Sequence, residues 1–428
     1  MRLPIRLPLF LSLAGFGPLA LAAPPDLRLA AAAFEEAQAT CHADAQALWG
    51  REVCVPLLFA DPVTRTVIAS QAGQGDALKP QDGVFTGRLP EQHNIANTAL
   101  DWDGVRWAMI VWPLPDDPAS RRSLMLHESW HAIQDSLGLP MRSPNPAHLA
   151  SVHGRVAMRM EWRALAAALR ATNPESERLA IADALAARAW RRRLDADAGA
   201  LENQLELNEG LAQFTGEQLS GRDDLDAWLA ADLKRRESGP SFVRSFAYGS
   251  GPAYGRLLER HAPGWRQRLD ADADLGLMLA QALALDTPAT RQELPDVTAT
   301  RLGLAGVLAE EQAIALARAE TTARWRQRLV DGPTVHLPFQ QMKISFDPGQ
   351  VFALPPQGTV YPVLRVVDAW GVLEASDGAL IADSWGGVTL PGPATRDGDR
   401  WQGPGWTLAL AEGWELDNAG PEPGLRKR

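Results

Sequence analysis

The pattern of apolar and polar positions divides the chain into a mixed N-terminal part, a long helical part and a strand-rich C-terminal part. Residues 26–49 carry alanine and leucine at helical spacing and predict a helix. Residues 53–69 predict two strands joined around the sequence FADPVTRT. An Asp-Gly pair at 103–104 lies between β-favouring runs, which predicts a hairpin whose second strand covers 105–112.

Beyond this hairpin, residues 117 to about 330 form Ala-, Leu- and Arg-rich segments with helical spacing. After residue 332 Val, Thr, Gly, Pro and Trp dominate, which predicts a β-rich accessory domain over 333–416. Residues 417–428 have the composition of a disordered tail. The predicted fold class is therefore α+β, with a first domain over 23–332 that combines a small N-terminal β-sheet with a mainly helical part.

The N-terminus has the features of an export signal. It carries two arginines, then an apolar run and then Ala-Leu-Ala, which predicts a signal peptide over 1–22 and export to the periplasm or the medium. No other stretch is apolar enough to span a bilayer, so we expect no membrane span after signal cleavage. In an exported chain the two cysteines, Cys41 and Cys54, predict one structural disulfide.

Composition and charge exclude some classes of protein. The 428 residues are 46% hydrophobic and 22% charged, as in globular proteins. The net charge of −10 argues against nucleic acid and anionic lipid as partners. We interpret the Arg-rich segment 187–199 as the solvated face of a helix, because acidic residues are near. Four tryptophans of the β domain are candidates for a binding surface or for its core: Trp370, Trp385, Trp401 and Trp406.

One predicted helix, over 117–138, carries candidate catalytic chemistry. An Asp-Pro pair is typical of its first residues and a glycine of its end. His127 and His131 are four residues apart, so they share a helix face and can bind one metal ion. Glu128 lies beside the first histidine, where it can reach a metal-bound water. This H-E-x-x-H arrangement predicts a zinc site, and a coincidental spacing is the alternative.

A catalytic zinc site needs a third protein ligand. The downstream sequence ALENQLELNEGLAQFTGEQ contains Glu202, Glu206 and Glu209 at positions i, i+4 and i+7. This spacing predicts that the three glutamates share one face of a helix, from which one of them can complete the site. A solvated acidic stripe is the alternative interpretation.

The two stretches HESWH and NEGLAQFTG resemble the gluzincin metallopeptidases, which place two histidines on one helix and a glutamate on a later one. The resemblance implies that Glu209 is the third ligand, with Glu206 as the alternative. SFAYGSGPAYG is similar to a gluzincin segment that supplies a tyrosine to the oxyanion, which implies Tyr248 rather than Tyr254. It also implies that a peptide binds along 105–112 as an edge strand, with an ordinary buried strand as the alternative.

Two features depart from the gluzincin pattern. Gln213 stands where some members carry an acid that orients a histidine, so we expect Asp135 or a backbone carbonyl to take this role. The span between His131 and Glu209 is long, so no particular peptidase family is assigned. The resemblance covers about residues 100–260.

The resemblance implies an exported zinc metallopeptidase that hydrolyses peptides or proteins, with one Zn²⁺ per chain bound by His127, His131 and Glu209. Glu128 is then the general base, and Tyr248 donates a hydrogen bond to the oxyanion. Two alternatives stay open. One is a zinc amide hydrolase with a non-peptide substrate, and the other is a non-catalytic binding or scaffold protein on a zincin fold.

Overall fold

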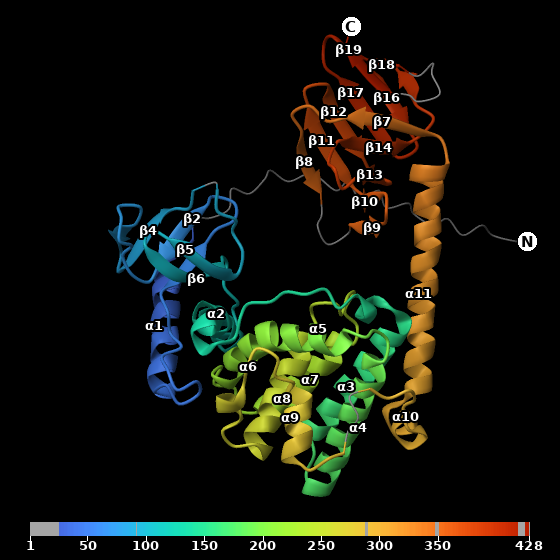
Figure 1. Ribbon diagram of the computed structural model, residues 1–428. Helices are drawn as coiled ribbons and strands as arrows, with labels where there is room; N and C mark the ends of the chain where they lie inside the picture. The colour runs from blue at the N-terminus through green and yellow to red at the C-terminus, as the bar shows by residue number, and fades with distance from the viewer. Residues whose placement is uncertain (1–24, 91, 287–289, 347–350, 418–423, 428) are drawn as a thin grey trace, which may run out of the picture. The chain divides into compact units, whose positions relative to one another are not determined.

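The computed structural model describes residues 25–90, 92–286, 290–346, 351–417 and 424–427. The chain divides into two compact units, Met1–Leu308 and Ala309–Arg428 (Figure 1). The first contains a β-sheet and a helical body, and the second contains two β-sheets. This mixed content confirms the α+β prediction at the level of class. The predicted signal peptide, residues 1–22, lies outside the described residues.

The sheet of the first unit has six strands in the order β3-β4-β2-β1-β6-β5. Its strands are β1 (Leu57–Ala60), β2 (Thr66–Ala69), β3 (Lys79–Gln81), β4 (Val84–Arg88), β5 (Thr98–Trp102) and β6 (Val105–Val111). The antiparallel pairs β1–β2 and β5–β6 confirm the two predicted strand pairs. Asp103 and Gly104 both have positive φ, as a tight hairpin turn requires. The edge-strand expectation for 105–112 is wrong, because β6 pairs with β1 and β5, and β5 is the edge.

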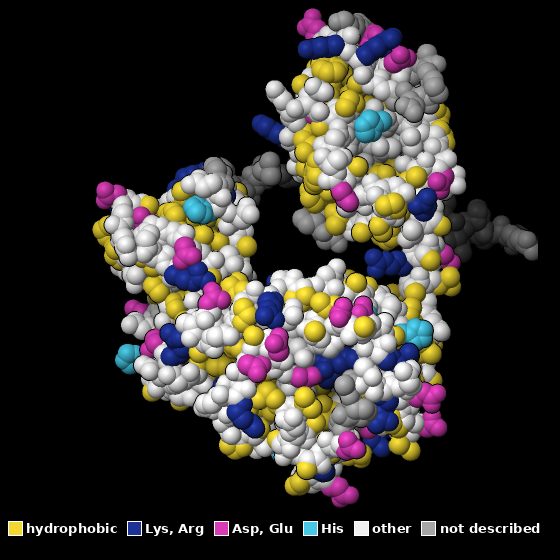
Figure 2. All heavy atoms as spheres, in the orientation of Figure 1, with side chains coloured by type: hydrophobic (Ala, Val, Ile, Leu, Met, Phe, Trp, Pro, Cys, Tyr) yellow, Lys and Arg dark blue, Asp and Glu magenta, His cyan; other side chains and the backbone are white. Residues whose placement is uncertain are grey.

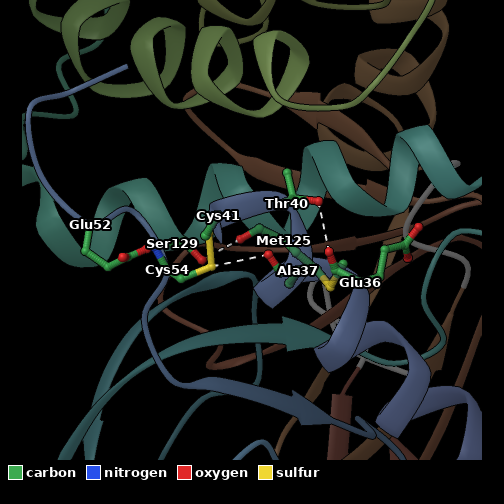
Figure 3. Close-up of a disulfide and its surroundings, with 8 residues drawn as sticks. All are labelled: Glu36, Ala37, Thr40, Cys41, Glu52, Cys54, Met125 and Ser129. Atoms are coloured by element: carbon green, nitrogen blue, oxygen red, sulfur yellow. Dashed lines mark hydrogen bonds between the residues drawn. A yellow bond between two sulfur atoms is a disulfide. The ribbon is translucent and has the colours of Figure 1, made fainter. Parts of the chain in front are cut away.

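One face of this sheet is covered by α1 (Leu27–Asp44) and α2 (Pro118–Ile133). Apolar residues of both helices, such as Ala33 and Met125, share a core with Phe59 and Ile110 of the sheet. A disulfide, Cys41–Cys54, links the last turn of α1 to the segment before β1, which confirms the predicted pairing. Figure 3 shows Met125 and Ser129 of α2 beside this bond.

The helical body of the first unit has a single large apolar core. Its α-helices are α3 (Val152–Leu169), α4 (Pro174–Arg192), α5 (Ala198–Leu205), α6 (Leu211–Gln218), α7 (Leu225–Arg236), α8 (Ala247–His261), α9 (Leu275–Ala282) and α10 (Asp296–Leu302). Its short helices are η1 (Gln134–Leu137), η2 (Ala147–Ala150), η3 (Glu206–Gly210) and η4 (Trp265–Arg268). The helix α2 packs against β5 and β6 and also against α6, so it joins the sheet to the helical body.

The second unit begins within α11 (Leu304–Arg326) and continues through η5 (Gln327–Asp331) into two mainly antiparallel sheets that share a core. One sheet contains β7 (Thr334–Pro338), β9 (Phe352–Leu354), β10 (Gly358–Tyr361), β13 (Ala379–Ile381), β14 (Gly387–Pro391), β18 (Trp414–Asp417) and β19 (Gly424–Lys427). The other contains β8 (Lys343–Phe346), β11 (Leu364–Asp368), β12 (Gly371–Ala375), β15 (Thr395–Asp397), β16 (Arg400–Gly403) and β17 (Trp406–Leu410).

Two expectations for this unit are resolved by its packing. Trp370 and Trp406 are buried in the core and Trp401 packs against it, whereas Trp385 is exposed. The core interpretation therefore holds for three of the four tryptophans. The tail is not disordered throughout, because residues 424–427 form β19, which pairs with β18 and β7. Residues 418–423 lie outside the described part.

The surface of the chain shows no grouping of charge by sign in the face drawn in Figure 2. Basic and acidic side chains are interspersed over the first unit on this face. The negative net charge is therefore spread rather than gathered there. Within the described residues, no helix has both the length and the apolar character needed to cross a membrane.

Candidate metal centre

The helix that carries the H-E-x-x-H motif begins and ends as its sequence predicts. Asp117 is the N-cap and accepts a hydrogen bond from the Ser120 backbone N–H at 2.9 Å, and Pro118 is the first helical residue. The helix α2 continues as η1, and Gly138 ends that turn with φ of 75°. Because α2 is packed on two sides, even its polar motif residues are buried.

His127, His131 and Glu209 form a compact group of three donor atoms. The two Nε2 atoms are 3.2 Å apart, and each lies 3.6 Å from Oε2 of Glu209. A circle through atoms at these distances has a radius of about 2.0 Å, which is the length of zinc bonds to histidine nitrogen and carboxylate oxygen. The three residues therefore fit one small divalent cation.

Glu209 reaches the histidines from η3, a π-helical turn between α5 and α6. A π-turn carries one residue more than an α-turn, so it rotates the residues that follow it. Glu209 consequently faces His127 and His131, whereas Glu202 and Glu206 face away from them, toward arginines. The prediction that the three glutamates share one face is wrong, because it assumed an uninterrupted α-helix.

Glu206 and Glu202 are structural residues in a buried ionic cluster. Glu206 forms a hydrogen bond of 2.9 Å with Arg188, and Glu202 forms one of 2.7 Å with Arg191. Glu206 is therefore not the third donor, and neither glutamate belongs to a solvated stripe. The cluster comprises Glu161, Arg188, Arg191, Arg192, Glu202, Glu206 and Asp274.

The same cluster corrects the interpretation of 187–199 as a solvated helix face. Arg188, Arg191 and Arg192 are all buried, because α4 is packed inside the helical body. Burial of three guanidinium groups requires opposite charges beside them, and these come from α3, α5, η3 and the N-cap of α9. These carboxylates lie on other elements, 10 to 86 residues from their arginine partners, so the local pattern of α4 does not show the pairing.

Glu209 is held by three further side chains besides the histidines. Tyr248 donates its hydroxyl to Oε2, and Arg244 donates to Oε1. Asn208 also donates to Oε1, at 3.2 Å. Burial alone raises the pKa of Glu209, but the hydrogen bonds from His127, His131 and Tyr248 hold it well below its usual range. Glu209 is therefore a carboxylate, the form that binds a metal.

Tyr248 and Tyr254, the two candidate tyrosines, have different environments. Tyr248 lies at the site, where its ring stacks on His127 with 5.5 Å between ring centroids. Burial and the hydrogen bond to Glu209 raise the pKa of Tyr248, so its hydroxyl keeps its proton. Tyr254 is fully buried and donates to Glu161 at 2.7 Å, in the packing position expected from the sequence.

Both histidines are oriented by glutamine side chains. Nδ1 of His127 lies 3.1 Å from Oε1 of Gln213, and Nδ1 of His131 lies 3.0 Å from Oε1 of Gln134. The expectation for Asp135 is wrong, because this side chain is exposed and its neighbour Gln134 is the one that points inward. Gln213, which the sequence analysis did not expect to orient a histidine, supplies the acceptor for His127.

Glu128 has no partner for one of its buried oxygens. Its Oε1 lies 4.0 Å from Nε2 of His127, and its Oε2 finds no hydrogen-bond partner among the described residues. Burial raises the pKa of Glu128, and the neighbouring histidines oppose this only in part. A buried carboxylate with a raised pKa and a free oxygen is suited to accept and return a proton.

These groups line a cavity of about 380 Å³. Its walls include Thr98 from the start of the edge strand β5, and Met141 and Arg142 from the loop after η1. Arg142 and Arg244 are the charged lining residues that the sequence did not single out. Neither arginine belongs to a recognisable sequence motif, and each reaches the histidines only through the fold. A larger cavity of about 660 Å³ between α3 and α4 contains no histidine.

A second group of potential metal donors lies near the N-terminus of the described chain. It consists of Cys41, Glu52 and Cys54. Because the two cysteines are joined in a disulfide, they offer no thiolate to a metal.

Comparisons of the chain with family models, with curated proteins and with solved structures found no match. Its function therefore has to be inferred from the chemistry of the cavity.

Proposed function

We propose that this protein is an exported zinc metallopeptidase whose first unit has a zincin-like fold. The proposal rests on one observation: Nε2 of His127, Nε2 of His131 and Oε2 of Glu209 lie 3.2 to 3.6 Å apart in a cavity that also holds Glu128. Two imidazoles and one carboxylate are a donor set of catalytic zinc sites. Calcium and magnesium prefer sets of oxygen atoms, which argues against both.

Three protein donors would leave one coordination position of a zinc ion for water or substrate. Zinc sites that catalyse hydrolysis use three protein donors and keep one position open. A zinc ion held by these three residues would supply Lewis acidity and would lower the pKa of a coordinated water toward neutrality. Gln213 and Gln134 accept the Nδ1 protons of His127 and His131, so in the neutral histidines Nε2 is the nitrogen that would bind the metal.

Glu128 moves the proton in the proposed reaction. Its free Oε2 accepts a proton from the attacking water and then delivers it to the leaving nitrogen. The raised pKa of this carboxyl makes proton transfer in both directions feasible. Tyr248 keeps its hydroxyl proton and donates it as a hydrogen bond to the oxyanion of the tetrahedral intermediate.

The edge strand β5 is the proposed place for an extended substrate. It pairs only with β6 in the described sheet, so its outer backbone groups are available to another strand. A peptide can bind such an edge by adding a strand. Thr98 at the start of β5 lines the cavity, so a peptide paired there reaches the proposed zinc site.

The proposed location outside the cytoplasm rests on two features. The structure contains a disulfide, which is typical of exported proteins. The sequence predicts a signal peptide over 1–22.

The decisive experiment measures zinc and turnover in the same preparations. We expect about one zinc per chain in the wild type and in Glu206→Gln and Glu128→Gln, and loss of zinc in Glu209→Gln. Wild type should cleave members of a mixed peptide library, and Glu128→Gln should lose nearly all turnover. Elemental analysis and mass spectrometry give the two readouts.

Three results would contradict the proposal in different ways. A wild type without zinc under metal-replete conditions favours the non-catalytic scaffold. Turnover of simple amides without any peptide cleavage favours a non-peptide amide hydrolase. An active Glu128→Gln variant removes the role of Glu128 while leaving the metal site intact.

A further inference from the structure

We propose that the cavity recognises a carboxylate group of the substrate close to the bond that is cleaved, and that Arg142 and Arg244 bind it. The identity of the substrate as a peptide rests on the proposed function, but the recognition of a carboxylate rests on the cavity alone. Both arginines line the same cavity as His127 and Glu128.

Arg244 is fixed beside the proposed zinc site and still has donors to spare. It donates to Oε1 of Glu209 and to Oγ of Ser143, and it also interacts with Tyr248. These contacts use at most three of the five N–H groups of a guanidinium. The side chain is 55% exposed and lines the cavity, so it can offer further donors to a ligand there.

Arg142 is held only loosely by its present partner. Its Nη1 lies 3.3 Å from Oδ1 of Asp272, whose side chain is 86% exposed. An ion pair with so exposed a partner contributes little free energy, so Arg142 can exchange it for a carboxylate on a ligand. Arg142 lies in the same loop as Met141 and Ser143, which also line the cavity.

The two arginines belong to the same wall of the cavity. Ser143 follows Arg142 in the chain and accepts a hydrogen bond from Arg244, which ties the loop to the turn before α8. A guanidinium presents parallel N–H groups that match the two oxygens of a carboxylate. Two of them on one wall, close to the histidines, form a site for an anionic group rather than for an apolar side chain.

The charge balance of the cavity favours the same conclusion. Its carboxylates are Glu128 and Glu209, and Glu209 already contacts Arg244 and both histidines. A divalent cation at the histidines leaves the lining positive overall. An anionic substrate group compensates that charge. On a peptide this group is either the C-terminal carboxylate or the side chain of Asp or Glu.

The test is a binding experiment that does not depend on turnover. The full-length Glu128→Gln protein is immobilised, with and without zinc, and exposed to acetylated hexapeptides of mixed sequence. One library has free C-terminal acids and the other has C-terminal amides. Bound peptides are identified by mass spectrometry. The same measurement is repeated with Glu128→Gln proteins that also carry Arg142→Gln or Arg244→Gln. A Glu128→Gln protein with Arg28→Gln is the control, because Arg28 is exposed and lies outside the cavity.

We expect retention of free acids over amides by about tenfold or more if the C-terminus is the bound group. Enrichment of Asp- or Glu-containing peptides in both libraries identifies a side chain instead. Either preference should fall about tenfold with Arg142→Gln and with Arg244→Gln, and should survive Arg28→Gln. Because Arg142 touches no metal donor, its effect separates carboxylate binding from any change in zinc content.

Equal retention of acidic and neutral peptides in both libraries, or no retention of any peptide, overturns the inference. So does a preference that both cavity variants leave unchanged. Failure of the proposed function is a different result. Wild type that cleaves peptides without regard to carboxylates keeps the peptidase and removes this inference. Binding of acidic peptides by a wild type that cleaves none keeps the inference and removes the peptidase.

Discussion

Gln213 and His127 are joined side chain to side chain, with 3.1 Å between Oε1 and Nδ1, although they lie 86 residues apart. The amide oxygen cannot donate, so Nδ1 of His127 carries a proton, and in the neutral histidine Nε2 is the nitrogen with the free lone pair. The other end of the amide donates to Glu217 at 3.0 Å, which fixes its orientation. One glutamine thereby determines which nitrogen of the histidine is available to a metal.

Replacement of Gln213 tests this relationship. Gln213→Met keeps the length of the side chain and removes the acceptor, so zinc affinity should fall by about 10- to 100-fold. Competition with a chelator of known affinity measures the change. Gln218→Met is the matched control, because Gln218 lies on the same helix and is not among the residues that line the cavity. An unchanged zinc affinity in Gln213→Met contradicts the orienting role.

Tyr248→Phe tests the proposed oxyanion donor. Loss of one such hydrogen-bond donor should lower turnover of peptides by about 10²- to 10³-fold, while zinc content stays the same. Steady-state kinetics and elemental analysis give both values. Tyr254→Phe is the control within the same helix. It should leave turnover unchanged and lower the free energy of unfolding by about 1–3 kcal/mol, because Glu161 loses a buried donor. Full turnover in Tyr248→Phe would rule out its catalytic role.

The buried ionic cluster predicts loss of stability in acid. Burial raises the pKa values of Glu202 and Asp274, but their arginine partners outweigh it and hold both well below the usual range. A carboxyl whose pKa is depressed by folding stabilises the folded state above its unfolded pKa, about 4, and loses that contribution as the pH falls toward its folded value.

The free energy of unfolding of the first unit should therefore be nearly constant near neutral pH and should decrease as the pH falls below about 4.5. Denaturant titrations followed by circular dichroism between pH 3 and pH 7 measure this. Glu202→Gln should be less stable at pH 7 and should show a shallower decrease. Equal stability of the wild type at pH 3 and pH 7 is the contrary outcome.

The close contact of η3 and α8 predicts a strong effect of a single methyl group. A Cβ on Gly251 would lie 2.3 Å from Cα of Gly210. Gly251→Ala should force the two helices apart, lower the free energy of unfolding by about 1–3 kcal/mol, and weaken zinc binding through Glu209. Gly306→Ala in α11 is the control, since its Cβ meets no atom within 4 Å. It should leave zinc binding unchanged, and a wild-type affinity in Gly251→Ala would contradict the prediction.

Local sequence signals predicted the elements that depend on neighbouring residues. The start of α2 at Asp117 and Pro118 is confirmed, as are the hairpin at 103–104 and the pairing of Cys41 with Cys54. Helix caps and tight turns depend on a few neighbouring residues. In a chain with two cysteines, each cysteine has one possible partner for a disulfide. The shared face of His127 and His131 follows from helical spacing in the same way.

The features that were missed depend on long-range packing. Arg188 appeared solvated because its buried partners, Glu206 and Asp274, lie on other elements. The edge of the sheet was misassigned, because β1 crosses over to pair with β6. Arg244 carries no signature in its own segment. Its place at Glu209 follows only from the contact between α8 and η3.

The π-turn at Glu206–Gly210 makes one continuous stretch of helix serve two separate ionic environments. On one side Glu206 neutralises Arg188 inside the helical body, and on the other Glu209 opens onto the cavity. The extra residue of the π-turn separates these two environments. A substitution on the cavity side can therefore change the chemistry of the site and leave the ion pair between Glu206 and Arg188 intact. Deletion of one residue from this turn should restore a regular α-helix and turn Glu209 away from the histidines.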